Sequence, residues 1–217
     1  MLDGSILELV FLAIIFVISI SLHEYAHAWT SVKLGDPTPE LQGRNTPNPL
    51  VHIDPLGFLM IFLVRFGWWR PVIVNPAYYK HPVRDELLVA LAGPATNVLL
   101  AIGGTIILMI YVLMVGSQAL MAGNDIIVQF WYMFGWLNII LAVFNMLPFP
   151  PLDGWRLVKF FLPNVARAVL PYQNWLMFGL LALLFLPGTG PVVRGFLTWL
   201  TGIIYGGIYT SLALVFL

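Results

Sequence analysis

The sequence contains no cysteine. That absence excludes disulfide frameworks, thiolate metal sites and cysteine nucleophiles, and it leaves the redox compartment undetermined. Charge is scarce too: Asp, Glu, Lys and Arg make up only 9% of the 217 residues, against about a quarter in soluble domains. So few charges cannot cover a chain that is 60% hydrophobic, and we expect its solvent to be lipid. The formal net charge is zero, which gives no electrostatic argument for a nucleic-acid partner.

Long apolar runs predict an all-α polytopic membrane protein, with residues 1–217 forming a single transmembrane domain. A run of roughly 20 apolar residues can cross the hydrocarbon core as a helix. We place five spans at about 6–32, 87–115, 126–147, 175–187 and 195–217. The region of about 50–75, between the first and second spans, holds a shorter apolar stretch that stops at Arg65. We interpret it as a re-entrant segment, because its length is too small for a span.

The basic residues predict the orientation. With the N-terminus outside, all of the ten Lys and Arg except Arg194 lie on the cytoplasmic side. Five spans then put the C-terminus on the cytoplasmic side. Residues 155–170 mix basic and apolar positions around Pro163 and predict a short interfacial helix. In the last span, Gly202 and Gly206 form a G-x-x-x-G pattern that could join two copies as a homodimer or serve packing within one chain.

The first span carries His23-Glu24-Tyr25-Ala26-His27, an H-E-x-x-H pattern. On a helix the two histidines share one face, so both imidazoles can bind one zinc ion. Glu24 then lies beside the metal, where it can take a proton from bound water. The alternative is that these are ordinary polar residues on a helix surface. However, three ionisable groups in one turn of a membrane helix are costly without a function. The pattern predicts one zinc per chain.

The third ligand must come from another segment. The candidates near the cytoplasmic ends of the spans are Asp36, His52, Asp54, Asp85, Glu86 and Asp153. The run from Asn145 to Gly154 favours Asp153, because this residue ends a span on the same side as the two histidines. The prolines within the run, Pro148, Pro150 and Pro151, cannot continue a helix, so we expect extended chain there. A plain proline-rich helix stop would not explain an Asp-Gly pair at that depth.

His23 to His27 and Asn145 to Gly154 resemble the two signature motifs of the site-2 protease family. Members of this family are intramembrane zinc metalloproteases that cut transmembrane helices. Blocks at 52–57, 67–76 and 92–97 are also similar to the family's, so the resemblance extends from about residue 20 to residue 156. Departures are Pro47, where an aliphatic residue is common, and Trp155, where the family often has a second glycine. The chain resembles a minimal form without the PDZ or CBS domain of many members.

The resemblance implies roles for individual residues. His23, His27 and Asp153 would bind zinc, and Glu24 would act as general base and then as general acid. Asn145 would hold the substrate or stabilise the transition state. The re-entrant segment would shield the site and pair with an unwound substrate strand. We hypothesise that the extended chain near Pro148 contributes to the same edge.

Three further polar residues have two interpretations each. Asn97 could contact substrate or could hydrogen-bond between helices. His52 and Asp54 could orient a zinc-bound imidazole, or they could be turn residues before Pro55.

The expected function is an intramembrane zinc metalloprotease that acts in regulated intramembrane proteolysis on the transmembrane helix of a protein substrate. A multi-pass protein of a prokaryotic plasma membrane, with its active site towards the cytoplasm, suits this minimal chain. One alternative is a membrane-bound endopeptidase for cytosolic or lipidated peptides. Another is a zinc-binding transporter or a non-catalytic scaffold. The nearly nonpolar stretches 99–115 and 176–186 disfavour a transport path, and the presence of Glu24 disfavours an inactive scaffold.

Overall fold

The computed structural model describes residues 6–64, 67–116, 118, 120 and 125–216. Within these residues the chain is helical, without a β-strand, and has one isolated bridge between Ile53 and Trp69. This confirms the all-α membrane class. The helices that are long and apolar enough to cross a membrane are α1 (Ile6–Lys33), α5 (Pro82–Val115), α7 (Ile126–Asn145) and α11 (Gly190–Phe216).

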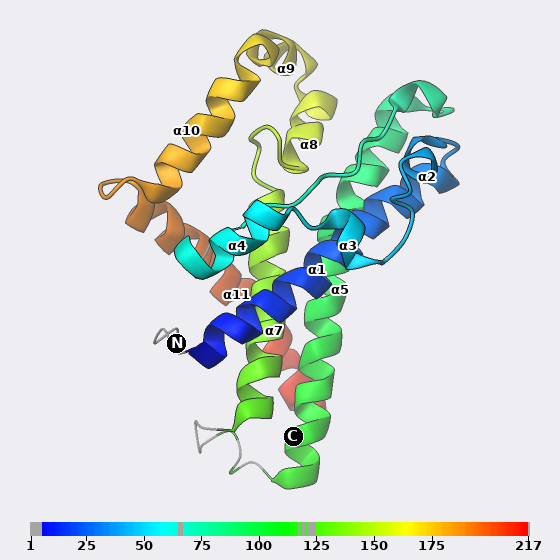
Figure 1. The fold of residues 1–217 in the computed structure, drawn as a ribbon. Helices are drawn as coiled ribbons and strands as arrows, with labels where there is room; N and C mark the ends of the chain where they lie inside the picture. Colours follow the sequence, from blue (N-terminus) through cyan, green and yellow to red (C-terminus); the bar gives the residue numbers. More distant parts are fainter. Residues whose placement is uncertain (1–5, 65–66, 117, 119, 121–124, 217) are drawn as a thin grey trace.

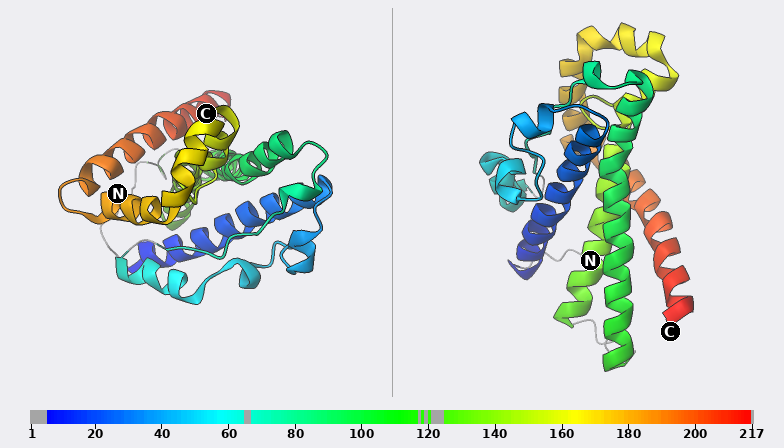
Figure 2. Two further views of the ribbon diagram at one scale, coloured as in Figure 1. Left: turned by 90° about the horizontal axis from the view of Figure 1, so that it is seen from above. Right: turned by 90° about the vertical axis from the view of Figure 1, so that its right-hand side faces the viewer.

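The centre of the molecule is formed by α1, α5 and α7 (Figure 1). Helix α5 packs along α7 and also against α1, while α11 packs on the opposite side of α5 and α7 (Figure 2). Apolar side chains fill these contacts, including the fully buried Ile15 of α1 and Ile139 of α7. Close approach between helices stabilises such a bundle in lipid. Gly135 of α7 provides it, because a Cβ there would lie 2.5 Å from the ring of Tyr205 on α11.

Helix α1 ends, α5 begins and α7 ends at the same end of the molecule, the upper end in Figure 1. The connection between α5 and α7, predicted as a polar loop, lies mostly outside the described residues, as does Leu217 of the last predicted span. At the upper end the chain continues from α7 into α8 (Gly154–Phe161), α9 (Pro163–Val169) and the 3₁₀ turn η2 (Leu170–Tyr172). These elements occupy the predicted interfacial region, and the helix breaks at Pro163 because proline lacks the N–H that would continue it.

The prediction of five spans is not confirmed. Helix α10 (Gln173–Phe185) has 13 residues, a length of about 20 Å, whereas the hydrocarbon core is about 30 Å thick. Both α10 and the following α11 run away from α9, so together they make one passage from the upper end (Figures 1 and 2). Helix α11 accordingly ends at the lower end, where α5 ends, and not at the end of α8 and α9.

The segment between α1 and α5 wraps one side of α1. It contains α2 (Thr38–Leu41), α3 (Pro49–His52), α4 (Pro55–Val64) and the 3₁₀ turn η1 (Pro76–Tyr78). The stretch from residue 67 to residue 75, here named the covering segment, is extended. It returns along α4 closely enough that a Cβ at Gly57 would overlap the main chain of Trp68. Arg65 lies outside the described residues, and re-entry of this region into the membrane stays a prediction.

Candidate metal centre

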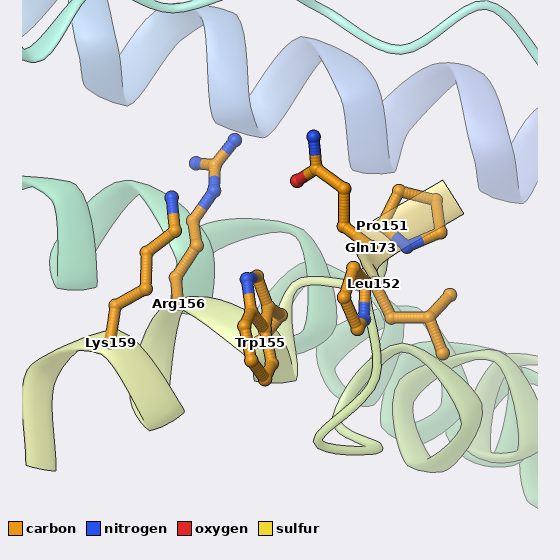
Figure 3. A pocket seen from close by; sticks show the side chains of 7 residues that line it. Pro151, Leu152, Trp155, Arg156, Lys159 and Gln173 are labelled. Atoms are coloured by element: carbon orange, nitrogen blue, oxygen red, sulfur yellow. The ribbon is translucent and has the colours of Figure 1, made fainter. Parts of the chain in front are cut away.

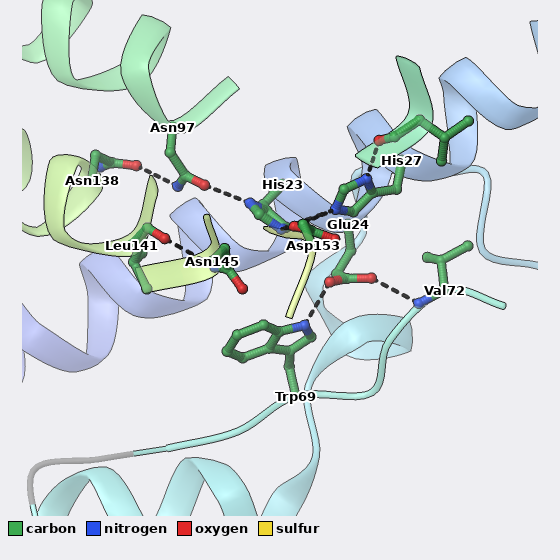
Figure 4. Close-up of polar contacts among 11 residues, drawn as sticks. His23, Glu24, His27, Trp69, Val72, Asn97, Asn138, Leu141, Asn145 and Asp153 are labelled. Atoms are coloured by element: carbon green, nitrogen blue, oxygen red, sulfur yellow. Dashed lines mark hydrogen bonds and ion pairs between the residues drawn. The ribbon is translucent and has the colours of Figure 1, made fainter. Parts of the chain in front are cut away.

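Three predicted ligands meet where α1 passes the start of α8. His23 and His27 lie one turn apart on α1, and their Nε2 atoms are 3.0 Å from each other. Each Nε2 atom is also 3.1 Å from Oδ2 of Asp153 (Figure 4). All three groups are nearly enclosed by protein, with side-chain exposures of 1%, 5% and 12%. One ligand atom from each residue can therefore reach a common point.

The far side of the His27 ring is fixed by a main-chain carbonyl. Nδ1 of His27 lies 2.6 Å from the carbonyl oxygen of Val89 on α5. A carbonyl oxygen only accepts hydrogen bonds, so Nδ1 carries the hydrogen and donates it. In the neutral imidazole, Nε2 then presents its lone pair to Asp153 and His23.

The far side of the His23 ring is fixed by a chain of two amides, which we name the amide relay. The main-chain carbonyl of Phe134 accepts from Nδ2 of Asn138 at 2.9 Å. Oδ1 of Asn138 accepts from Nδ2 of Asn97 at 2.9 Å, and Oδ1 of Asn97 lies 2.5 Å from Nδ1 of His23. Because a carbonyl can only accept, it sets the direction of both amides, and His23 must donate from Nδ1.

The resulting cluster contains acceptors only. Two imidazole lone pairs and one carboxylate oxygen face each other at 3.0–3.1 Å, with no hydrogen of the neutral rings between them. Such a group is repulsive unless a proton or a cation lies among its members. Gly93 of α5 keeps the space clear, because a Cβ there would lie 2.5 Å from Nε2 of His23. Two nitrogens and one carboxylate oxygen form a common zinc shell in hydrolases, so these residues fit that ion.

Glu24 lies next to this cluster and is held by the covering segment. Its Oε1 accepts a hydrogen bond from the indole Nε1 of Trp69 at 2.5 Å, and its Oε2 accepts one from the main-chain N–H of Val72 at 2.7 Å (Figure 4). The residue is 3% exposed. Two donors on two different oxygens fix the plane of the carboxylate, so Glu24 has a single orientation beside the cluster.

The other candidates for the third ligand have different partners. Asp36 is fully buried and accepts hydrogen bonds from Ser31 and from the main chain of Thr38 and Asn75. Burial alone would raise the pKa of its carboxyl, but these hydrogen bonds outweigh burial and hold the pKa below its usual value. Asp85 accepts from the main-chain N–H of His81.

His52 and Asp54, predicted to orient a zinc-bound imidazole, contact neither histidine of the cluster in the described contacts. His52 donates from Nε2 to the carbonyl of Thr46 at 2.8 Å. Asp54 accepts from the main chain of Gly57 and lies 3.5 Å from the guanidinium of Arg70, and these interactions lower its pKa. Both residues therefore organise α3, α4 and the covering segment, which is nearer to their interpretation as turn residues.

Asn97 forms the hydrogen bond between helices that was one of its two interpretations, and the chain at Pro148 has another conformation than expected. Asn97 is fully buried, and both ends of its amide are engaged inside the protein, so it orients His23. Pro148 is exposed, but the chain around it forms turns and is not extended. The N–H groups of Phe149 and Leu152 bond to the carbonyls of Leu147 and Phe149, which curls the segment. Asn145 is buried and donates to the carbonyl of Leu141 at 3.0 Å.

Sequence reasoning missed Asn138 and Trp69. The signal for Asn138 was present, because a lone asparagine inside an apolar span is costly without a partner. Trp69 belongs to the block at 67–76, and the sequence gives it no individual role. Its bond to Glu24 depends on the path of the covering segment over α1, which no local pattern records.

Comparisons with known proteins identify a family model and several relatives that match this chain. The family model for peptidase family M50 matches residues 109–187. "Putative zinc metalloprotease YwhC" of Bacillus subtilis is 37% identical over 183 residues, which cover 84% of this chain and 83% of that protein. "Putative zinc metalloprotease Rip2" of Mycolicibacterium smegmatis is 31% identical over 170 residues, 74% of this chain and 61% of that protein. Rip2 of Mycobacterium tuberculosis is 30% identical over 199 residues, 88% and 70% of the two chains.

No solved structure gives a significant match. The relatives nevertheless extend over most of the chain, and the family seen in the motifs is confirmed. The four apolar helices of sufficient length among the described residues make the protein an integral membrane protein. The chain belongs to peptidase family M50, the site-2 protease family of zinc metalloproteases.

Proposed function

We propose that the protein is an intramembrane protease that hydrolyses a peptide bond within or near a transmembrane helix of its substrate. One zinc per chain would be held by His23, His27 and Asp153. The observation that carries the proposal is the acceptor-only cluster next to Glu24, enclosed in a bundle of membrane helices. A carboxylate beside two imidazoles fixed in the metal-binding tautomer is suited to hydrolysis.

Glu24 is the proposed general base. Zinc bound to the cluster would lower the pKa of a water towards 7 and polarise the substrate carbonyl. Each oxygen of Glu24 accepts one hydrogen bond from the covering segment, so each retains a lone pair for a proton. Glu24 then takes a proton from the attacking water and delivers it to the departing amide nitrogen.

Asn145 is the proposed donor to the substrate. Its NH₂ group gives one hydrogen to the carbonyl of Leu141, and the second hydrogen remains for an oxygen that gains negative charge in the transition state. For strand pairing with unwound substrate, the covering segment now replaces the chain near Pro148 as the proposed edge, because the former is extended and the latter forms turns.

Substrate must gain access to buried groups. His23, Glu24 and His27 are all at most 4% exposed, and the covering segment contacts Glu24 directly. A substrate helix can therefore reach the site only after a neighbouring element moves. We place the α8 end of the molecule on the cytoplasmic side of a prokaryotic plasma membrane, since the described basic residues other than Arg194 concentrate there.

Zinc analysis combined with a cleavage assay tests the proposal. Purified wild type and Glu24→Gln should each bind about one zinc, and only the wild type should cleave a single-span model substrate. A soluble peptide with the same cleavage sequence is the control. Faster cleavage of that peptide would favour a general membrane endopeptidase. Zinc binding without cleavage of either substrate would contradict the protease assignment.

A further inference from the structure

A hollow of about 320 Å³ lies beside α8, at the end of the molecule where α7 ends (Figure 3). One wall is the turn that precedes α8, with Leu152 at its end, and the opposite side includes Gln173 at the start of α10. The remaining wall is α8 itself, which contributes Trp155, Arg156 and Lys159. The polar ends of Arg156, Lys159 and Gln173 extend in the same direction in Figure 3. All three carry N–H groups, so the hollow is rich in donors.

Two of its donors are buried and have no acceptor among the described residues. Trp155 is 7% exposed, and its indole N–H has no hydrogen-bond partner there. Nη1 of Arg156 is enclosed and equally without a partner. A buried donor without an acceptor costs roughly 1–3 kcal/mol, and more when it is charged. Two such donors on adjacent residues lining one hollow favour an occupant that offers several acceptor oxygens.

The charge of the hollow favours an anion. Lys159 lies 3.3 Å from Glu86, which offsets its charge. Arg156 forms no ion pair within the described part of the chain, so it leaves one positive charge uncompensated. A second hollow of about 200 Å³ is also lined by Arg156 and Lys159, together with Glu86. The two cations thus lie between two openings at the surface, where a headgroup of a single negative charge can be bound.

The surroundings of α8 are those of a helix at a membrane surface. Beyond the hollow, Phe161 and Leu162 are 66% and 54% exposed. Exposed apolar side chains beside a cationic face are typical of a helix that lies at the headgroup boundary. Basic pockets at the ends of membrane helices bind the phosphate groups of lipids.

We propose that this hollow binds the phosphate group of an anionic phospholipid, and that Trp155 and Arg156 turn their enclosed N–H groups into the hollow to donate hydrogen bonds to its oxygens. Arg156 supplies the charge, and Trp155 supplies a neutral donor. The site begins two residues after Asp153, so a bound lipid would hold the start of α8, and with it this metal ligand, against the membrane surface. The binding itself requires neither zinc nor proteolysis, so its test is independent of the proposed function.

Thermal unfolding of detergent-purified protein tests the site. Dihexanoyl-phosphatidylglycerol, a soluble short-chain anionic lipid, should raise the unfolding temperature of the wild type in a saturable way. Arg156→Gln and Trp155→Phe should each raise the half-saturating concentration, by about tenfold for the charged donor and severalfold for the indole. Arg167→Gln is the matched control, because Arg167 lies nearby on α9 and bonds to Asn164 outside the hollow. This control should respond as the wild type does.

Three further ligands distinguish the sources of the anion. Dihexanoyl-phosphatidylcholine, inorganic phosphate and a soluble glutamate-rich peptide should give no comparable shift at equal concentration. An equal shift with phosphate alone would make the site one for free phosphate, and an equal shift with the peptide would make it a contact for acidic protein segments. Either result overturns the lipid assignment. A wild-type response in both Arg156→Gln and Trp155→Phe would remove the site altogether.

Discussion

Asn138 of α7 accepts a hydrogen bond from Asn97 of α5 at 2.9 Å, and this contact connects the His23 ring on α1 to the backbone of a third helix. Both asparagines are fully buried. The relay ends at a main-chain carbonyl, whose role as acceptor cannot be reversed, so the direction of every bond in it follows. Three helices therefore set the tautomer of one metal-binding imidazole.

The amide relay predicts a defect in metal binding far from the ligands. Asn138→Leu should leave Asn97 without its acceptor and weaken zinc binding by about 10- to 100-fold, the usual effect of losing such a supporting group. Competition with a chromophoric zinc chelator measures this affinity. Thr105→Val is the matched control. Thr105 of α5 is a buried polar residue like Asn138, but it bonds to Ala101 and Tyr205 and not to the relay. Wild-type affinity in a folded Asn138→Leu protein would refute the relay.

Gly93 predicts a steric block of the metal site. In Gly93→Ala the new Cβ would overlap Nε2 of His27 and lie 2.5 Å from Nε2 of His23. The imidazoles would have to turn away from Asp153, so zinc per chain should fall well below one. Gly103→Ala on the same helix is the control, because a Cβ there meets open space. Elemental analysis of both variants at equal helicity measures the effect, and full zinc occupancy in Gly93→Ala would count against the site.

The sequence predicted the metal ligands of the cluster better than the groups that orient them. The spacing of His23 and His27 predicts a shared face because helix geometry is local. Asp153 was predicted as the third ligand because it ends a span on the same side of the membrane as the two histidines. The groups behind the histidines, Val89 and Asn97, depend on how α5 rotates against α1. Such rotations are set by packing across the whole interface, and no short motif records them.

The membrane topology shows the same limit. The bounds of α1, α5 and α7 lie close to the predicted spans because a long apolar run has few other solutions in lipid. Residues 175–187 were predicted as a full span, but α10 has only 13 residues, from Gln173 to Phe185, and is too short to cross the membrane alone. Apolarity alone does not separate a short helix packed beside the bundle from a crossing. The extended chain expected at Pro148 was wrong because nearby N–H groups bond locally in turns.

Trp69 predicts a catalytic defect that spares the metal. Trp69→Phe removes the N–H that Glu24 accepts but retains an aromatic ring next to His23 and Phe16. A hydrogen bond to a charged group contributes about 1.5–3 kcal/mol, so kcat should fall roughly 10- to 100-fold if the bond is lost from the reacting state. KM and zinc content should stay near wild type. Trp68→Phe is the control for general effects on the covering segment, because Trp68 is a partly exposed neighbour of Trp69.

Asp36 predicts a pH-dependent contribution to stability. Its Oδ2 accepts from Ser31 and from the main chain of Asn75, and Oδ1 accepts from the main chain of Thr38. These bonds connect the end of α1 to the covering segment and lower the pKa of the carboxyl against the effect of burial. A lowered folded-state pKa gives stability that is fully present above the unfolded-state pKa of about 3.9 and is lost as the pH falls through the folded-state value.

Asp36→Asn should therefore unfold at a lower temperature than the wild type at pH 7, because its NH₂ group would face donors in place of an acceptor. A buried donor left without an acceptor costs roughly 1–3 kcal/mol. The difference between the two proteins should shrink as the pH falls below 4, since the wild type then loses its charged acceptor as well. Thermal unfolding in detergent from pH 7 to pH 2.5 measures this. Glu40→Gln, an exposed carboxyl on α2, serves as the control. A difference of equal size at both ends of the range would show that Asp36 acts through packing and not through its charge.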